Sequence, residues 1–276
     1  MTSGTEWQAA VGRNWADMYR KTDRSFSNLT AHLLERLAPL PGTAVLDIGC
    51  GAGELTLAVA SARPQASVTG VDISEDLITA ALERAGDREL VHFAVADASA
   101  WEPDGPAPDL LISRHGVMFF PDPPGAFAHL RQIAAPGANF AFSCFRTPRE
   151  NPWASDMAAM LPANGPARVP TDPHAPGPFA FANPDHVRAI LLAGGWTDIS
   201  FAAFDYSFVA GLGEDPLADA AEFFSRIGPA ASALRQLPEG ELAAVQGRIK
   251  AWLEQHRDGN RVAFPAAAWI VTARNG

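Results

Sequence analysis

The sequence has little positive charge and little sulfur. Of its 276 residues, 21 are Lys or Arg and 31 are Asp or Glu, which gives a formal net charge of -10, and Lys21 and Lys250 are the only lysines. Nucleic-acid binding needs clustered cations that neutralise phosphates, so we expect a small-molecule partner and no nucleic acid. Two cysteines, Cys50 and Cys144, are too few for a disulfide framework or a thiolate metal site. We therefore expect reduced thiols and no metal.

Long apolar runs are also missing. No run approaches the ~20 residues that a membrane span needs, and the opening stretch MTSGTEWQAAVGRNW lacks the basic and apolar regions of a secretory signal. The sequence thus predicts a cytoplasmic location and no membrane span. Hydrophobic residues make up 47% of the chain, enough for one sizeable core with an added cap.

Short apolar runs alternate with amphipathic segments through the first half of the chain. This alternation predicts a doubly wound α/β sheet. The expected strands are 43–48, 67–72, 91–97, 109–113, 139–145, 198–209 and 266–274. The expected helices are 7–19, 28–37, 54–62, 75–85, 124–134 and 184–193, with a helical block over 216–255.

Composition divides the chain into four parts. We expect an N-terminal helical cap over 1–42 and a cofactor-binding core over 43–147. A proline-rich insertion over 148–182 would line a substrate pocket. The C-terminal part, 183–276, would complete the core and carry a helical lid over 214–257, which could pair with a second subunit in a homodimer.

The stretch AVLDIGCGAGELTLAVA, residues 44–60, places Gly49, Gly51 and Gly53 between a strand and a helix. Exposed amides at a positive helix terminus suit an adenosine-type cofactor, although such glycines also let a helix pack close to its strand. Asp72 closes the next strand, where a carboxylate can accept both ribose hydroxyls. The alternative role of Asp72 as a helix N-cap is better served by Ser74.

Two further carboxylates bear on the cofactor. Asp97 ends the third strand, where it could accept from an adenine amino group or simply form a turn. Asp47 precedes Gly49 by two residues, and a carboxylate there would repel a pyrophosphate but suit the ammonium of a methionine moiety. The loop G-C-G-A-G also differs from the dinucleotide fingerprint G-x-G-x-x-G. S-adenosylmethionine (SAM) is therefore favoured over a nicotinamide cofactor.

The motifs VLDIGCGAG, VTGVDIS and ADA, with the late final strand, resemble those of class I SAM-dependent methyltransferases. The segment ISRHGVMFFPDPPGAFAHLRQIAAPGANFAFSCFRTPRENPW is similar to the ubiquinone/menaquinone methyltransferase-like bacterial group (methyltransferase type 11/25-like). The resemblance implies a Rossmann-like sheet of seven strands with the last antiparallel, SAM as cofactor and S-adenosylhomocysteine as product. It also implies that the three glycines contact the methionine part, Asp72 the ribose, and Asp97 with Ala98 the adenine.

The expected cofactor site is completed by residues that adjoin these motifs or lie on the N-terminal helix. They are Cys50, Ile73, Ser113, Arg114, Trp15 and Tyr19. Trp7, Trp15 and Tyr19 lie near one helical face and could close over the sulfonium, since aromatic faces attract cations. They would equally serve as the packing face of an amphipathic helix.

His115 lies just past the fourth strand, where ligands bind in open α/β sheets, and is the candidate base. Its alternative role is packing, and the narrower group usually has an aromatic residue here. Phe119, Trp153 and Phe179 are the expected apolar walls of the acceptor pocket. Arg146 or Arg114 could hold a substrate carboxylate.

The sequence therefore predicts a SAM-dependent methyltransferase with a small, hydrophobic or aromatic acceptor. O-methylation is favoured because His115 would then have a proton to accept. The alternatives are a non-catalytic SAM-binding protein and an NAD(P)-dependent oxidoreductase.

Overall fold

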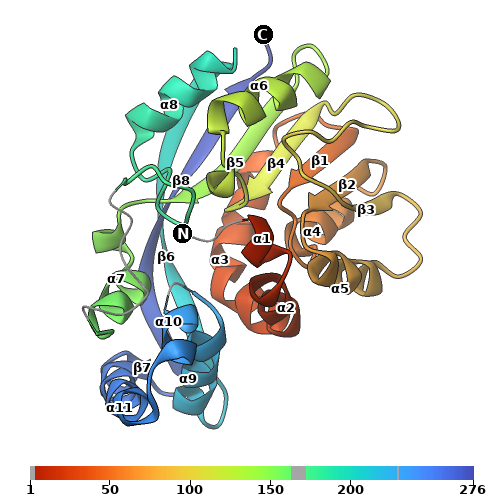
Figure 1. Cartoon of the computed structure of the whole chain (residues 1–276). Coiled ribbons are helices and arrows are strands. Elements are labelled where there is room, and N and C mark those ends of the chain that lie inside the picture. Colours follow the sequence, from red (N-terminus) through yellow and green to blue (C-terminus); the bar gives the residue numbers. More distant parts are fainter. Residues whose placement is uncertain (1–3, 163–171, 229) are drawn as a thin grey trace.

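One mixed β-sheet forms the centre of the molecule (Figure 1). The computed structural model describes residues 4–162, 172–228 and 230–276. Seven strands follow the order β3-β2-β1-β4-β5-β8-β6, and a short β7 pairs with β8. The strands are β1 (Ala44–Ile48), β2 (Ser67–Asp72), β3 (Val91–Val95), β4 (Leu110–Arg114), β5 (Asn139–Phe145), β6 (Thr197–Leu212), β7 (Arg257–Asp258) and β8 (Arg261–Arg274).

The strand directions confirm the doubly wound sheet. β1 to β5 pair in parallel, whereas β8 runs antiparallel to both β5 and β6. The expected Rossmann-like sheet of seven principal strands with an antiparallel last strand is therefore confirmed. The central strands are largely apolar because helices cover them: in β4, Leu110, Leu111 and Ile112 are all 0% exposed.

Figure 1 shows the helices grouped around the sheet, with α6 beside α8 and α3 beside α4. The helices are α1 (Gly4–Trp7), α2 (Ala10–Asp17), α3 (Tyr19–Leu37), α4 (Glu54–Ala62), α5 (Glu75–Ala85), α6 (Pro123–Ile133), α7 (Pro152–Ala159), α8 (Pro184–Ala193), α9 (Pro216–Arg226), α10 (Ala231–Gln236) and α11 (Glu239–Gln255), with short 3-10 turns η1 (Val117–Phe119) and η2 (Pro148–Glu150). Among the residues described, no helix is both long and apolar enough to cross a membrane.

β6 and β8 are unusually long. They contain 16 and 14 residues, compared with a typical strand of about 5–6 residues. Both strands run beyond the parallel sheet, and α9, α10 and α11 are carried at their far end (Figure 1). Part of the proline-rich insertion, 163–171, lies outside the described residues.

The N-terminal helices differ from the sequence prediction. A single helix over 7–19 is wrong, because α1 ends at Trp7, α2 ends at Asp17, and α3 begins at Tyr19 well before the expected start at 28. Tertiary packing sets these breaks, since the sequence carries no proline there. α2 packs tightly on α5: a Cβ added to Gly12 would lie 2.1 Å from the Ser74 hydroxyl oxygen. α3 instead packs against β6 and α4.

Candidate functional site

The loop from β1 to α4 carries the three glycines, and all three have left-handed backbones. Their φ angles are +65° at Gly49, +57° at Gly51 and +80° at Gly53. A Cβ at Gly49 would lie 2.9 Å from the Cα of Gly116, and one at Gly53 would lie 2.8 Å from the Phe93 ring. A Cβ at Gly51 would meet nothing within 4 Å. Gly49 and Gly53 thus permit close packing, and Gly51 alone opens onto free space at the N-terminus of α4.

Asp72 joins this loop to the next one. Its Oδ2 accepts from the Gly51 amide at 3.0 Å, and its Oδ1 accepts from the Ser74 amide at 2.9 Å. Burial raises the pKa of Asp72, and these backbone hydrogen bonds act in the opposite direction. Ser74 is the N-cap of α5, accepting from the Leu77 amide. The carboxylate is therefore held beside Gly51, where a ribose was expected.

Asp47, the last-but-one residue of β1, is 1% exposed. Its Oδ2 accepts from the Thr56 hydroxyl at 2.6 Å, and its Oδ1 has no hydrogen-bond partner among the described residues. Burial raises the pKa of Asp47 to about 6. An unpaired buried acceptor costs free energy, so this oxygen is suited to a donor that arrives with the ligand.

The other expected cofactor residues have different surroundings. Asp97 is exposed, and its carboxylate accepts hydrogen bonds from the amide and hydroxyl of Ser99, as expected for a residue that forms a turn. Ala98 is buried, with 6% of its surface exposed. The Ser113 hydroxyl donates to the Ile48 carbonyl, which ties β4 to β1. Cys50 is buried, and desolvation raises the pKa of its thiol. Ile73 follows Asp72 and is partly exposed.

Arg114 ends β4 and is already engaged. It forms an ion pair with Glu54, donates to the Thr30 hydroxyl at 2.8 Å, and lies 5.1 Å from the centre of the Phe26 ring. Burial lowers its pKa. Glu54 was not among the predicted site residues. It occupies the first position of α4, and its carboxylate pairs with the Arg114 guanidinium that was expected to bind a ligand.

His115 follows β4 in a strained conformation. Its φ is +63°, a left-handed value that is rare outside glycine and costs of order 1–3 kcal/mol. The Gly116 backbone is pressed against β1, since a Cβ there would lie 2.5 Å from the Ile48 carbonyl oxygen. His115 thus lies at the start of a tight turn between β4 and η1.

Two aromatic side chains, Phe26 and Phe145, contact the His115 imidazole, and three more pack on these two. We call them the aromatic cage: Phe26, Phe145, Trp153, Phe179 and Phe208. The imidazole stacks on Phe145 at 3.9 Å between ring centres and meets the edge of Phe26 at 5.4 Å. Its Nδ1 lies 3.5 Å from the Ser143 hydroxyl, and its Nε2 has no partner among the described residues. His115 is 8% exposed, and burial, reinforced by the Arg114 charge, holds its pKa well below the ordinary value.

The structure separates the expected aromatic residues into three groups. Trp153 and Phe179 belong to the aromatic cage, with ring centres 5.1 Å and 5.9 Å from that of Phe145. Phe119 instead contacts Trp7, which contacts Trp15. Tyr19 lies on another helix, where its ring is covered by the guanidinium of Arg84 at 4.5 Å. Trp7, Trp15 and Tyr19 therefore do not form one face.

Arg146 lies next to Phe145 in sequence but contacts other residues. It forms ion pairs with Glu150 and Asp205 and lies 5.2 Å from the centre of the Trp269 ring. None of these partners belongs to the aromatic cage. A role for Arg146 in holding a substrate carboxylate stays a prediction, and it would require these pairs to open.

Phe26, Phe145 and Phe208 were not among the predicted site residues. They come from α3, β5 and β6, so no local spacing reveals that they meet. One signal was available for Ser143: it is a hydroxyl inside the otherwise apolar strand NFAFSCF, two residues from Phe145 and so on the same face.

This arrangement fits an adenosyl cofactor with a positive methionine end. Gly51 leaves open space at the positive terminus of α4, Asp72 lies beside it, and Asp47 offers an unpaired buried oxygen. Two carboxylates close to the loop suit hydroxyl and ammonium groups, whereas a pyrophosphate would be repelled.

Comparison with known proteins agrees with this chemistry. The family described as "Methyltransferase domain" matches residues 19–175. A trans-aconitate 2-methyltransferase of Variovorax paradoxus (strain S110) is 31% identical over 207 residues, covering 74% of each chain. Aklanonic acid methyltransferase DauC of Streptomyces sp. (strain C5) is 34% identical over 121 residues, 43% of this chain and 55% of that one. The chain thus spans about half the length of this second relative.

Solved structures share the fold. The YcgJ protein from Bacillus subtilis has a TM-score of 0.56 at 14% identity, covering 90% of this chain and 98% of that one. Phosphoethanolamine N-methyltransferase 2 of Haemonchus contortus, solved with S-adenosyl-L-methionine, has a TM-score of 0.52 at 19% identity, covering 90% of this chain and 52% of that one. At these identities the likeness concerns the fold alone.

The fold and the site define a class I SAM-dependent methyltransferase. The chain belongs to the methyltransferase-domain family, with SAM as its cofactor. This sets aside the oxidoreductase and the non-catalytic alternatives.

Proposed function

We propose that the chain transfers a methyl group to a hydroxyl oxygen of a small acceptor with an apolar or aromatic body, and that His115 accepts the hydroxyl proton. The observation that carries this proposal is the unpaired Nε2 of a buried imidazole inside the aromatic cage. A lowered pKa keeps the ring neutral, and a neutral imidazole offers a lone pair to a proton.

The chain's residues would act by position and by proton transfer. SAM supplies a methyl carbon that its sulfonium activates towards displacement. With Nδ1–H donating to the Ser143 hydroxyl oxygen, Nε2 would carry the free lone pair. Phe26 and Phe145 hold the imidazole plane, and the surrounding rings exclude water. As the new oxygen–methyl bond formed and the methyl–sulfur bond of the sulfonium broke, releasing S-adenosylhomocysteine, the hydroxyl proton would pass to Nε2 of His115.

The cofactor contacts remain our proposal. Gly49, Gly51 and Gly53 with Asp47 would hold the methionine part, Asp72 the ribose, and Asp97 with Ala98 the adenine. Support comes from the open space at Gly51 and from the position of Asp72 between the two loops.

Replacing Asp72 with Asn is expected to weaken SAM binding by about 1.5 kcal/mol, close to tenfold in Kd, because a charge-assisted hydrogen bond to the ribose is lost. Calorimetric titration measures the effect. Asp87→Asn, an exposed position with the same chemical change, is the control and should bind as the parent does. An unchanged Kd for Asp72→Asn would remove Asp72 from the cofactor site.

A carboxylic acid is the second candidate acceptor. The relatives' names identify trans-aconitate and aklanonic acid as their substrates. A multiply charged acid suits the cage poorly, because Arg114, the cation beside His115, is already paired with Glu54, and burying an unpaired carboxylate is costly.

Matched acceptors distinguish the two candidates. With methyl-labelled SAM, we expect 4-propylphenol to be methylated at least about tenfold faster than 4-propylbenzoate, since the carboxylate must be desolvated without a cation. Trans-aconitate is the third acceptor. Label transferred only to the benzoate or to trans-aconitate would replace the hydroxyl proposal with the carboxylic acid.

A further inference from the structure

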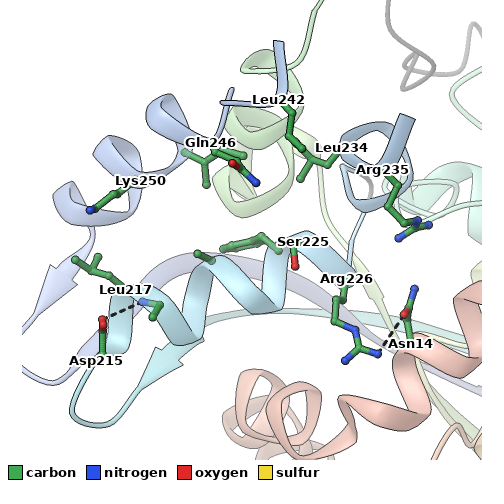
Figure 2. Close-up of a pocket in the computed structure, with 14 residues that line it drawn as sticks. Asn14, Asp215, Leu217, Ser225, Arg226, Leu234, Arg235, Leu242, Gln246 and Lys250 are labelled. Carbon is green, nitrogen blue, oxygen red and sulfur yellow. Dashed lines mark hydrogen bonds between the residues drawn. The ribbon is translucent and has the colours of Figure 1, made fainter. Parts of the chain in front are cut away.

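We propose that a groove on the outer side of α9 binds a small amphipathic monoanion, with its acidic group at Arg235 and its apolar body between α9 and α11. The groove has a volume of about 770 Å³, within the ~300–1,000 Å³ range of small-molecule sites. Helices α9, α10 and α11 form it, with Asn14 of α2 at one end (Figure 2).

The walls of the groove are two facing apolar stripes. On α9 the stripe is Leu217, Ala221 and Phe224, and on α11 Leu242 and Ile249 belong to the stripe. Spacings of three, four and seven residues put each set on one helical face. Leu234 of α10 also lines the groove, near Leu242 (Figure 2). Ala221 is exposed, so the floor of the groove lacks a large side chain.

The groove is separate from the aromatic cage because α9 lies between them. Phe223 contacts Phe208 of the cage, with 5.8 Å between ring centres. The next residue, Phe224, lines the groove and packs on Trp252 and Phe264 instead. A ligand in the groove would therefore touch the opposite side of α9 from the acceptor.

Positive charge is concentrated in the groove although the chain carries a net charge of -10. Three cations and one acid line it: Arg226, Arg235, Lys250 and Asp215. Arg226 is held by Asp17 and Asn14 of α2. Within the described part of the chain, the side chains of Arg235 and Lys250 make no hydrogen bond or ion pair.

The two ends of the groove differ. Figure 2 shows Arg235 and Arg226 at the end near Asn14, and Lys250 with Asp215 at the opposite end. A guanidinium can bind a carboxylate through two hydrogen bonds, and a second guanidinium, that of Arg226, lies at the same end of the groove. The anionic end of the ligand is therefore assigned to Arg235, and the apolar stripes accommodate the rest.

Decanoate is the probe, and calorimetric titration is the measurement. We expect one decanoate to bind per chain, and Arg235→Gln to weaken binding about tenfold, as expected for a charge-assisted contact. Lys250→Gln, which removes one positive charge from the opposite end, is the matched control and should bind as the parent does. Ala221→Trp fills the groove and should abolish binding. Each variant should retain its affinity for SAM, which shows that it is folded.

Several outcomes would overturn the proposal. Decanoate binding that survives Ala221→Trp would place the ligand elsewhere. Equal weakening by Arg235→Gln and Lys250→Gln, or equal binding of decanol, would mean that no specific anion contact exists. If decanoate fails to bind and sedimentation shows a dimer that Ala221→Trp dissociates, a second copy of the chain covers the groove instead.

Discussion

Replacement of His115 by Ala or by Asn is expected to lower the turnover number at least about 100-fold, since general-base catalysis contributes about 10²–10⁴. Both variants remove the lone pair of Nε2, an atom that is buried and has no hydrogen-bond partner among the described residues. Asn tolerates the left-handed φ of +63° better than Ala does. If both variants bind SAM normally and are equally inactive, backbone strain does not explain the loss.

The pH profile provides an independent measurement. Burial keeps the pKa of His115 well below its ordinary value of 6.5, so the imidazole stays neutral at and above that pH. Turnover should therefore show no titration near 6.5. His92→Ala, the same change at an exposed position on β3, is the control. Parent-like turnover in His115→Asn would mean that His115 only packs, and a parent profile with a midpoint near 6.5 that His115→Asn abolishes would mean that the pKa of His115 is not lowered.

The strands and helices around the glycine loop could be predicted from the sequence because their signals are local. Strand β1, the glycine loop and α4 are contiguous, and Asp72 follows at the end of the next strand. Helix α5 was placed at its observed limits, Glu75–Ala85, because Ser74 is a recognisable N-cap. These features depend on short-range chemistry that spacing reveals.

The acceptor end could not be predicted in the same way. Phe26 and Phe208 meet around His115 only because α3 packs on β6, and this contact joins distant parts of the chain. The break at Met18, between α2 and α3, likewise follows from what each helix packs against. Gly12 of α2 fits against Ser74 at the start of α5, whereas α3 packs on β6. No propensity in the sequence marks these contacts.

The glycine loop was recognised from the sequence, but the sequence does not show which of its glycines are needed for packing as well as for ligand approach. All three glycines were assigned to ligand approach. That assignment stays a prediction, and the structure adds a packing role at two of them, since a Cβ at Gly49 or Gly53 would clash with Gly116 or Phe93, whereas one at Gly51 would meet nothing within 4 Å. Fold stability and cofactor access therefore share one short motif.

Replacement of Asp47 by Asn is expected to stabilise the protein at neutral pH, by up to about 3 kcal/mol. Burial raises the pKa of Asp47 from 3.8 to about 6, so the folded state binds its proton more tightly than the unfolded state does. Between these two values the folded state holds more protons, and stability falls as pH rises. Above about 6 the whole cost of a buried, half-paired carboxylate is present.

Asn keeps an oxygen that can accept from the Thr56 hydroxyl and removes the charge. The advantage of Asp47→Asn should therefore grow by about 2 kcal/mol between about pH 4.5 and pH 7.5, measured by urea unfolding of both proteins without cofactor. Asp104→Asn, at an exposed position, is the control and should show no such growth. An advantage that stays constant with pH would mean that the Asp47 carboxylate is not a buried charge in the folded protein. A constant effect would then reflect packing or hydrogen bonding alone, because only an ionisable group can make the difference between the two proteins depend on pH.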